Sequence, residues 1–156
     1  MRFTIAAALA LIAASSLQAQ AVSPAPAVDF SIATPLPGTW TYAATTDGSE
    51  ASFLDATSRP QLFLRCTRTS RVVTIARPAT AAAPFLSIWT TSQTRNLPAS
   101  YNPATYRLSA SVTAGDPLLD AIAFSRGRFA VSVSGTTALI APAWEEPARV
   151  VEDCRA

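Results

Sequence analysis

The chain has 156 residues, and its 12 basic side chains nearly balance its 10 acidic ones, for a formal net charge of +2. A charge this small gives no reason to expect a nucleic acid as partner. Because the chain contains no histidine and no lysine, Ser-His-Asp triads, Cys-His dyads, imidazole metal sites, Schiff bases and phosphate loops of the Walker type are all excluded. We therefore expect no cofactor and no metal.

Residues 1–21 have the pattern of a secretory signal peptide. Arg2 is a minimal basic start, Ile5–Ala14 is an apolar run, and Ala19-Gln20-Ala21 is a small-x-small cleavage site. The run is too short to cross about 30 Å of hydrocarbon, and no comparable run follows it. With no cysteine at the junction to accept a lipid, we expect cleavage near Ala21 and a soluble bacterial protein that is periplasmic or secreted.

After the signal peptide, residues 22–37 are rich in proline and predict an extended leader, in which only Val28–Ile32 has the composition of an edge strand. From residue 38 onward, turn-forming residues interrupt short runs of Thr, Val and aromatic residues about every eight to twelve positions. This rhythm predicts one mainly β domain over residues 38–156, a β-sandwich or partly open barrel of about seven to nine short antiparallel strands.

The clearest local signal is a hairpin, with strands Thr39–Ala44 and Ala51–Leu54 around the turn Thr46-Asp47-Gly48-Ser49. Next, Gln61–Thr67 alternates between apolar and polar residues, which places Cys66 on the core face. Further strands are expected at Arg71–Ala76, Phe85–Thr91, Thr105–Val112 (with Tyr106 on its core face), Phe129–Val133 and Thr137–Ala141.

A short helix is expected near residues 116–125. Asp116 suits the N-cap, Pro117 suits the first helical position, and Gly127 marks the end of the helix. The polar segment Ser125–Arg128 is interpreted as the C-terminal cap of this helix, because arginines there suit the negative end of the helix dipole.

A second helix is expected near residues 143–154, where Glu145 and Glu146 suit the first turn and Cys154 faces the sheet. The other cysteine is Cys66, and export places both thiols in an oxidising compartment. A disulfide between them is therefore predicted. It would close a loop of about 90 residues, which contributes roughly 4–5 kcal/mol in the chain-entropy model.

Five arginines fall in one stretch that spans two predicted strands and their turn. On a common face they would form an anion-binding site, because planar guanidinium groups capture carboxylate or phosphate in a bidentate manner. The alternative is that they are solvated strand positions whose charge prevents edge-to-edge aggregation. The five are Arg59, Arg65, Arg68, Arg71 and Arg77.

Carboxylates are the only other candidate catalytic groups. Two of them about 5 Å apart, or roughly 6.5–9.5 Å apart, would hydrolyse a glycosidic bond. Each also has a plainer explanation, in a turn, at a helix terminus or beside an arginine, so no catalytic residue is assigned. The candidates are Asp47, Asp55, Asp116, Asp120, Glu145, Glu146, Glu152 and Asp153.

The C-terminal segments DPLLDAIAFSRGRFAVSVSG and PAWEEPARVVEDCR resemble small uncharacterised exported proteins of alphaproteobacteria. More distantly, a strand cysteine at position 66, a strand ending in Ser134-Gly135 and a helical Cys154 resemble the β-rich exported proteins related to invasion-associated locus B and the type VI accessory protein VasI. The resemblance implies a disulfide-tied β-sandwich with a binding or accessory role in the envelope. It supplies no functional residue.

These observations favour an exported, non-catalytic binding or accessory protein of the bacterial cell envelope, with an envelope protein or an anionic envelope polymer as its partner. One alternative is a secreted protease inhibitor that presents a loop or its leader, residues 22–37, to an active site. The other is a carboxylate-dependent hydrolase acting on an envelope glycan.

Overall fold

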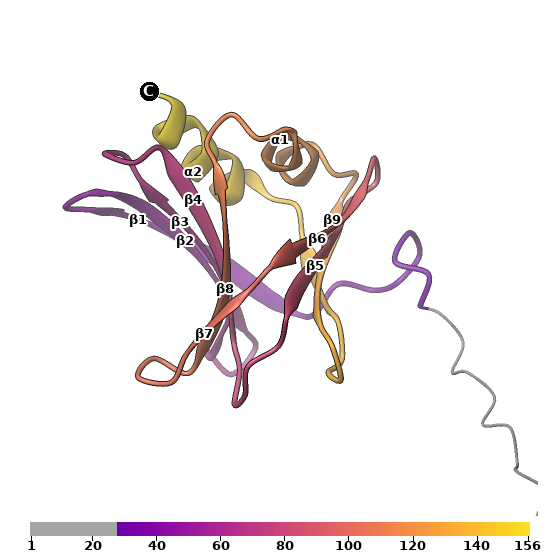
Figure 1. The fold of residues 1–156 in the computed structure, drawn as a ribbon. Helices are drawn as coiled ribbons and strands as arrows, with labels where there is room; N and C mark the ends of the chain where they lie inside the picture. Colours follow the sequence, from indigo (N-terminus) through magenta and orange to yellow (C-terminus); the bar gives the residue numbers. More distant parts are fainter. Residues whose placement is uncertain (1–27) are drawn as a thin grey trace, which may run out of the picture.

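The computed structural model of the chain describes residues 28–156 (Figure 1). The expected signal peptide and the first residues of the leader lie outside the described residues, so they remain predictions. Within 28–156 the chain forms ten strands and two helices. Their bounds are β1 Gly38–Thr45, β2 Gly48–Asp55, β3 Pro60–Thr67, β4 Val72–Pro78, β5 Phe85–Trp89, β6 Thr94–Pro98, β7 Ser100–Asn102, β8 Arg107–Thr113, α1 Pro117–Ala123, β9 Arg128–Val133, β10 Leu139–Pro142 and α2 Glu145–Arg155.

The strands form two antiparallel sheets, one of six strands in the order β1-β2-β3-β4-β8-β7 and one of four in the order β10-β9-β5-β6 (Figure 1). Only Ala99 separates β6 from β7, so the chain passes there directly from one sheet to the other. On the opposite side, the amide of Leu36 donates to the carbonyl of Ile140 in β10 at 2.8 Å. The predicted fold class, a β-sandwich or partly open barrel with two helices, is confirmed.

The predicted hairpin is the pair β1 and β2, with a shorter turn than expected. Only Thr46 and Asp47 form the turn, and Thr45 pairs with Gly48. Gly48 lies within the ladder, between two strands, because its backbone approaches β3 closely. A Cβ at this position would lie 2.2 Å from the carbonyl oxygen of Cys66, so only glycine fits without a shift of the backbone.

Two strands were missing from the sequence prediction. β6 contains Arg95, Asn96 and a terminal Pro98, and β7 is three residues long, so neither has the β-branched and aromatic composition that indicates a strand. Their place is set by pairing, since β6 is held by β5 and β7 by β8. The count of ten strands is therefore above the expected seven to nine.

Two local predictions were wrong. Val28–Ile32 forms a turn instead of an edge strand, because the carboxylate of Asp29 accepts hydrogen bonds from the amide and hydroxyl of Ser31 at 2.9 and 2.6 Å. Tyr106 precedes β8 in a turn, with a φ of 51°, and it is exposed. The alternation that places Leu108 in the core begins only after this turn.

Helix α1 begins as predicted, because Asp116 is its N-cap and accepts a hydrogen bond from the amide of Leu118 at 2.8 Å. It ends at Ala123, however, with Phe124 as the C-cap. Gly127 has the positive φ of 75° expected of a turn glycine, but it lies beyond the helix. The prediction that it ends the helix was wrong.

The segment Ser125–Arg128 caps α1 only in part: the amide of Ser125 donates to the carbonyl of Ile122 at 3.3 Å, whereas Arg126 and Arg128 bond elsewhere. The hydroxyl of Ser125 is buried, donates to the carbonyl of Arg128 and accepts from the amide of Thr91 at 3.1 Å. These bonds fasten the start of β9 to the turn after β5. The same polar residue types are suited to capping a helix and to linking distant segments by hydrogen bonds, so the sequence alone does not distinguish the two roles.

Helix α2 lies against the inner face of the six-stranded sheet, as the buried positions of Val150, Val151 and Cys154 require. The predicted disulfide joins Cys154 to Cys66 in β3, with a Cα–Cα distance of 5.4 Å. The indole Nε1 of Trp40 also donates to the carbonyl of residue 142, just before the helix, at 2.9 Å. The C-terminal helix is thus fixed at both ends.

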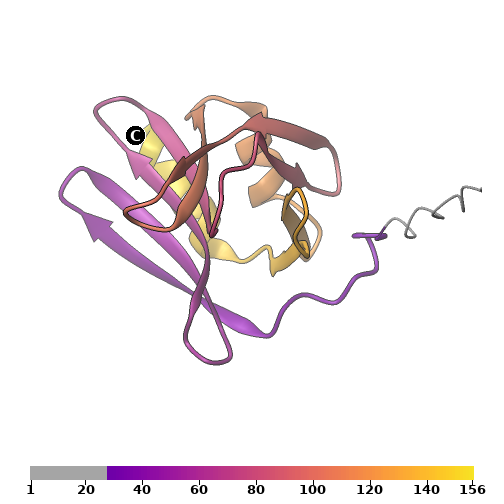
Figure 2. The same ribbon diagram turned by 60° about the horizontal axis from the view of Figure 1, so that its bottom comes forward.

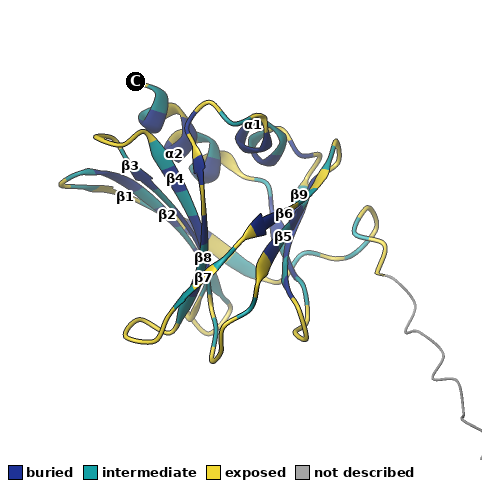
Figure 3. Cartoon of the chain, viewed as in Figure 1, coloured by how far each residue is buried: buried dark blue, intermediate teal, exposed yellow. Residues whose placement is uncertain are grey.

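Buried residues line the facing sides of the two sheets and the undersides of the helices (Figure 3). Both helices lie at one end of the molecule, where they fill the space between the sheets (Figure 1). The opposite end of the described domain carries loops and no helix, and we call it the open end (Figure 1). Neither helix in the described part of the chain is long and apolar enough to cross a membrane.

Candidate binding site between the two sheets

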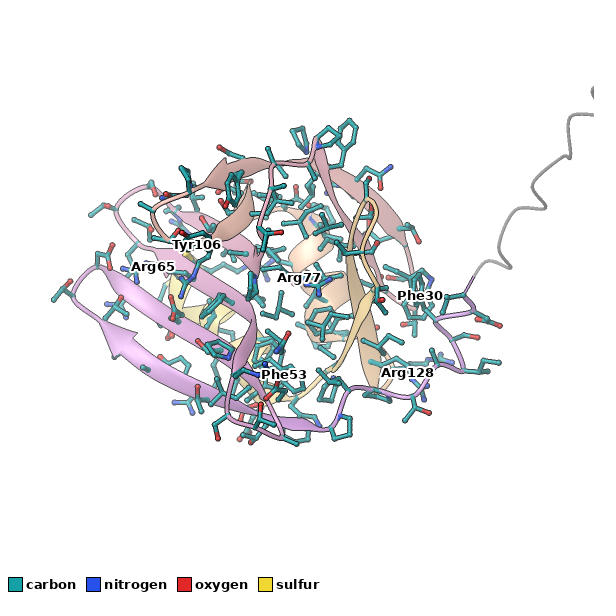
Figure 4. All side chains as sticks on the ribbon, turned by 90° about the horizontal axis from the view of Figure 1, so that it is seen from below. Phe30, Phe53, Arg65, Arg77, Tyr106 and Arg128 are labelled. Carbon is teal, nitrogen blue, oxygen red and sulfur yellow. A yellow bond between two sulfur atoms is a disulfide. The ribbon has the colours of Figure 1, made fainter. Side chains whose placement is uncertain are left out.

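The open end of the domain is formed by the connections β2–β3, β4–β5, β7–β8 and β9–β10 (Figure 1). Arg77, near the end of β4, lies between the two sheets at this end (Figure 4). It continues the alternation of Val73 and Ile75, which are fully buried on the inner face of the sheet. A guanidinium group thus occupies a position that the strand pattern assigns to the core.

The polar contacts of Arg77 are to backbone oxygens. Its Nη1 donates to the carbonyl of Val131 in β9 at 2.8 Å and to that of Thr137 at 3.4 Å. Its Nε is buried without a hydrogen-bond partner. Burial lowers the pKa of the guanidinium from its ordinary value, although an arginine stays charged at any physiological pH.

No carboxylate neutralises this charge among residues 28–156. The ion pairs in this range join Arg59 to Asp55, Arg65 to Asp47 and Glu50, Arg95 to Asp116, and Arg155 to Asp120. Two carbonyl dipoles solvate a guanidinium only in part, and a half-buried cation without a counter-ion is costly in a medium of low dielectric constant. Arg77 therefore carries a charge that a bound anion would neutralise.

Arg77 lines two separate hollows. The first, of about 150 Å³, is bounded by the alanine-rich β4–β5 connection, residues 79–83, together with Val133. The second, of about 270 Å³, is bounded by Leu36 and by residues 137–140 before and within β10. Both are small and largely apolar except for Arg77, a few hydroxyls and, in the second hollow, the amide of Gln61. This is the chemistry of a site for a small ligand with one anionic group.

The five arginines predicted as one cluster do not come together. Arg59 and Arg68 lie at opposite ends of β3, and Arg65 is on the outer face of the sheet, 2.6 Å from Asp47 (Figure 4). Arg71 donates to the carbonyl of Arg155 at the end of α2. Only Arg77 reaches the interior, so the candidate anion site contains one of the five.

The strand pattern of the sequence distinguishes Arg77 from the other four arginines, although all five were predicted together. Alternation in β4 places odd-numbered positions inward, so Arg77 shares the face of Val73 and Ile75, whereas Arg65 belongs to the outward face of β3. The carbonyls of Val131 and Thr137 that receive Arg77 were not predictable, because they come from β9 of the other sheet and from the connection between β9 and β10.

The carboxylates have the environments of structural residues. The pKa of Asp55 is lowered to about 2, first by the hydroxyl of Thr57 and then by the amide of Arg59, which together close the β2–β3 turn. The pKa of Asp153 is lowered mainly by the hydroxyl of Tyr42, which donates to it at 2.5 Å. A glycosidase acid needs a raised pKa, so these two groups lack the property that the hydrolase alternative requires.

The described part of the leader lies against the domain. Arg128 donates to the carbonyl of Ala33 (Figure 4), and the ring of Phe30 is 5.7 Å from that of Trp89. Together with the bond from Leu36 to β10, these contacts hold the segment beside the four-stranded sheet. A tail-type protease inhibitor needs a segment free to enter an active site, so this part of the leader gives that alternative no support.

Comparisons with protein-family models, with curated proteins and with solved structures found no match to this chain. The resemblance to exported alphaproteobacterial proteins therefore remains a prediction. Residues 28–156 contain no group of three or more Cys, Asp or Glu side chains placed to hold a metal ion.

Proposed function

We propose that the chain is an exported, non-catalytic binding protein of the bacterial cell envelope, and that Arg77 holds a carboxylate group of its ligand in the crevice between the two sheets. The observation that carries this proposal is an arginine on the core face of β4 that lacks an acidic partner in the described chain, has an unpaired Nε and lines two hollows. The signal peptide and the disulfide support export.

A carboxylate suits the site better than a phosphate. One planar guanidinium can pair with the two oxygens of one carboxylate, whereas a phosphate offers a third charged oxygen that would need donors of its own. Hydroxyls are the only other polar side chains beside the first hollow, at Thr80, Ser134 and Thr136. The apolar walls favour a hydrocarbon group next to the carboxylate, as in a short organic acid or the carboxyl terminus of a small peptide.

The proposal is tested with sodium hexanoate as the probe. Amide chemical shifts of the isotopically labelled protein are followed during titration with hexanoate and, separately, with hexanol at the same ionic strength. We expect saturable shifts with hexanoate only, confined to residues around Arg77, with a dissociation constant of about 1 mM or below. The absence of saturable shifts on wild-type protein up to about 10 mM refutes the carboxylate site.

Two variants define the role of the charge. Arg77→Met keeps the hydrocarbon stem and removes the guanidinium, so we expect hexanoate binding to be lost. Arg59→Met is the matched control, because Arg59 is an exposed arginine whose ion partner is Asp55. If Arg77→Met, shown to be folded by its amide spectrum, binds hexanoate as wild type does, Arg77 is not the binding residue.

A further inference from the structure

Strand β1 is an unprotected edge of the six-stranded sheet. It pairs only with β2, and nothing of the described chain lies along its other side (Figure 2). Its sequence, GTWTYAAT, has eight residues without charge or proline. Proteins usually blunt such edges with charges, proline, bulges or short strands. The other sheet edges follow this rule, because β6 contains Arg95 and Pro98, β10 ends in Pro142 and β7 has three residues.

The hairpin turn decides which backbone groups of β1 are free. In a hairpin with a two-residue turn, the residues that flank the turn, Thr45 and Gly48, form a hydrogen-bonded pair. Hydrogen-bonded and non-hydrogen-bonded pairs alternate along an antiparallel ladder, and the two adjacent turn residues cannot themselves form a hydrogen-bonded pair. Every second residue of β1, counted from Thr45 toward the start of the strand, therefore bonds to β2. The backbone amides and carbonyls of the residues in between are directed away from the sheet. Outside the β1–β2 ladder, the one hydrogen bond to these groups within residues 28–156 is a long one of 3.4 Å, from the hydroxyl of Thr39 to the carbonyl of Trp40. The free positions are Gly38, Trp40, Tyr42 and Ala44.

We propose that β1 pairs antiparallel with β1 of a second copy of this chain, which joins two six-stranded sheets into one. The register that engages all free positions sets Gly38 opposite Ala44 of the partner subunit, with Thr41 opposite its own copy on the two-fold axis. About eight backbone hydrogen bonds form, two for each hydrogen-bonded pair. The contact is isologous and closes on itself, as most homodimers do.

Self-pairing is favoured because this register is self-complementary. Trp40, which is buried in its own protomer, lies opposite Tyr42 of the partner subunit, and the two-fold axis repeats this cross-strand pair. The Tyr42 ring is already held in place, with its hydroxyl bonded to Asp153 and the guanidinium of Arg149 stacked 4.1 Å from the ring centroid. No charge lies on the strand itself, and the guanidinium of Arg149 beside Tyr42 is close enough to the carboxylate of Asp153 to help lower its pKa, so its charge is partly balanced.

The test introduces a positive or a negative charge at Thr41, which lies opposite its own copy in the proposed dimer. Thr41 is exposed on the outer face, so Thr41→Lys and Thr41→Glu are tolerated by the monomer. Each variant alone would place like charges directly opposite one another, and we expect its dimer dissociation constant to rise about tenfold or more. An equimolar mixture places Lys opposite Glu, and we expect it to form heterodimers. The same two substitutions at Ser111, exposed on β8, are the controls and leave dimerisation unchanged.

Sedimentation velocity over a concentration series gives the result. Wild-type protein that remains monomeric up to about 1 mM overturns the proposal, and so does a Thr41→Lys variant that associates as wild type does. Failure of the Lys and Glu variants to associate when mixed overturns the register. Ala44→Pro removes one outward amide without touching the β2 ladder, so it provides a charge-independent variant that must also weaken the dimer.

Discussion

Removal of the Cys66–Cys154 disulfide should lower the free energy of unfolding by an amount that depends on how far apart the two cysteines are in the sequence. The two cysteines are 88 residues apart, and the loop-closure relation for that length gives a loss of about 15 cal/mol/K, or about 4.6 kcal/mol at 25 °C. The Cα–Cα distance of 5.4 Å is in the ordinary range for disulfides, so no backbone strain offsets this gain. A typical domain has a total stability of about 5–15 kcal/mol, so the disulfide accounts for a large share.

The assay is urea unfolding of the double variant Cys66→Ala, Cys154→Ala. With an m-value near 2 kcal/mol/M, the midpoint should fall by roughly 2 M, and the slope should rise because the unfolded chain without the cross-link is less compact. Wild-type protein reduced while unfolded and measured in reductant should unfold at the same midpoint as the variant, which separates loss of the cross-link from loss of the sulfur atoms. A midpoint shift below about 0.5 M in both samples would contradict the loop-entropy reasoning.

Three further outcomes can be measured by denaturation. Asp116→Ala should cost about 1 kcal/mol in the free energy of unfolding, because it removes the N-cap of α1; an unchanged midpoint would show that the cap is dispensable. Since the folded pKa of Asp55 is lowered to about 2, its contribution to stability is complete above the unfolded pKa of about 3.9 and is lost as the pH falls toward 2. Asp55→Asn should therefore flatten the pH dependence of stability in that window, and a curve parallel to wild type would contradict this. Gly48→Ala should cost about 1–3 kcal/mol, because its Cβ would lie 2.2 Å from the oxygen of Cys66, whereas Gly115→Ala, with no atom within 4 Å, should be nearly neutral. Equal losses at the two glycines would argue against the close approach at β2.

Local chemistry predicted the elements that carry strong local signals. The hairpin at β1 and β2, the alternation of β3 and the start of α1 at Asp116 each depend on residues a few positions apart. β6 and β7 depend instead on the strands that they pair with, and their own composition disfavours a strand. The C-terminal helix was predictable from the acidic residues of its first turn, and its disulfide was predictable because Cys66 is the only other cysteine in the sequence.

The candidate site was predictable only in part, because its parts come from distant segments. An anion site made of arginines was expected, and Arg77 was among the five. Which arginine enters the core depends on strand alternation, and what it meets there depends on how the two sheets face each other. Val131 contributes a backbone oxygen, and a backbone acceptor leaves no mark in the sequence. The same reason explains why Arg128, interpreted as a cap, instead binds the leader at Ala33.

Two roles for Arg77 predict different results in denaturation experiments. Arg77 either acts as a strut, which we define as a structural link between the two sheets, or binds a ligand. As a strut, it contributes its bonds to Val131 and Thr137, and Arg77→Met loses about 1–3 kcal/mol because the partly buried carbonyl of Val131 loses a charged donor. That loss does not depend on hexanoate. As a site, Arg77 makes the stability of wild-type protein depend on the ligand, with a gain of about 1.4 kcal/mol at ten times the dissociation constant. Because a strut needs no unpaired Nε and no hollows beside it, we expect hexanoate to raise the urea midpoint of wild type and to leave that of Arg77→Met unchanged. Equal shifts in the two proteins would assign Arg77 to the strut role alone.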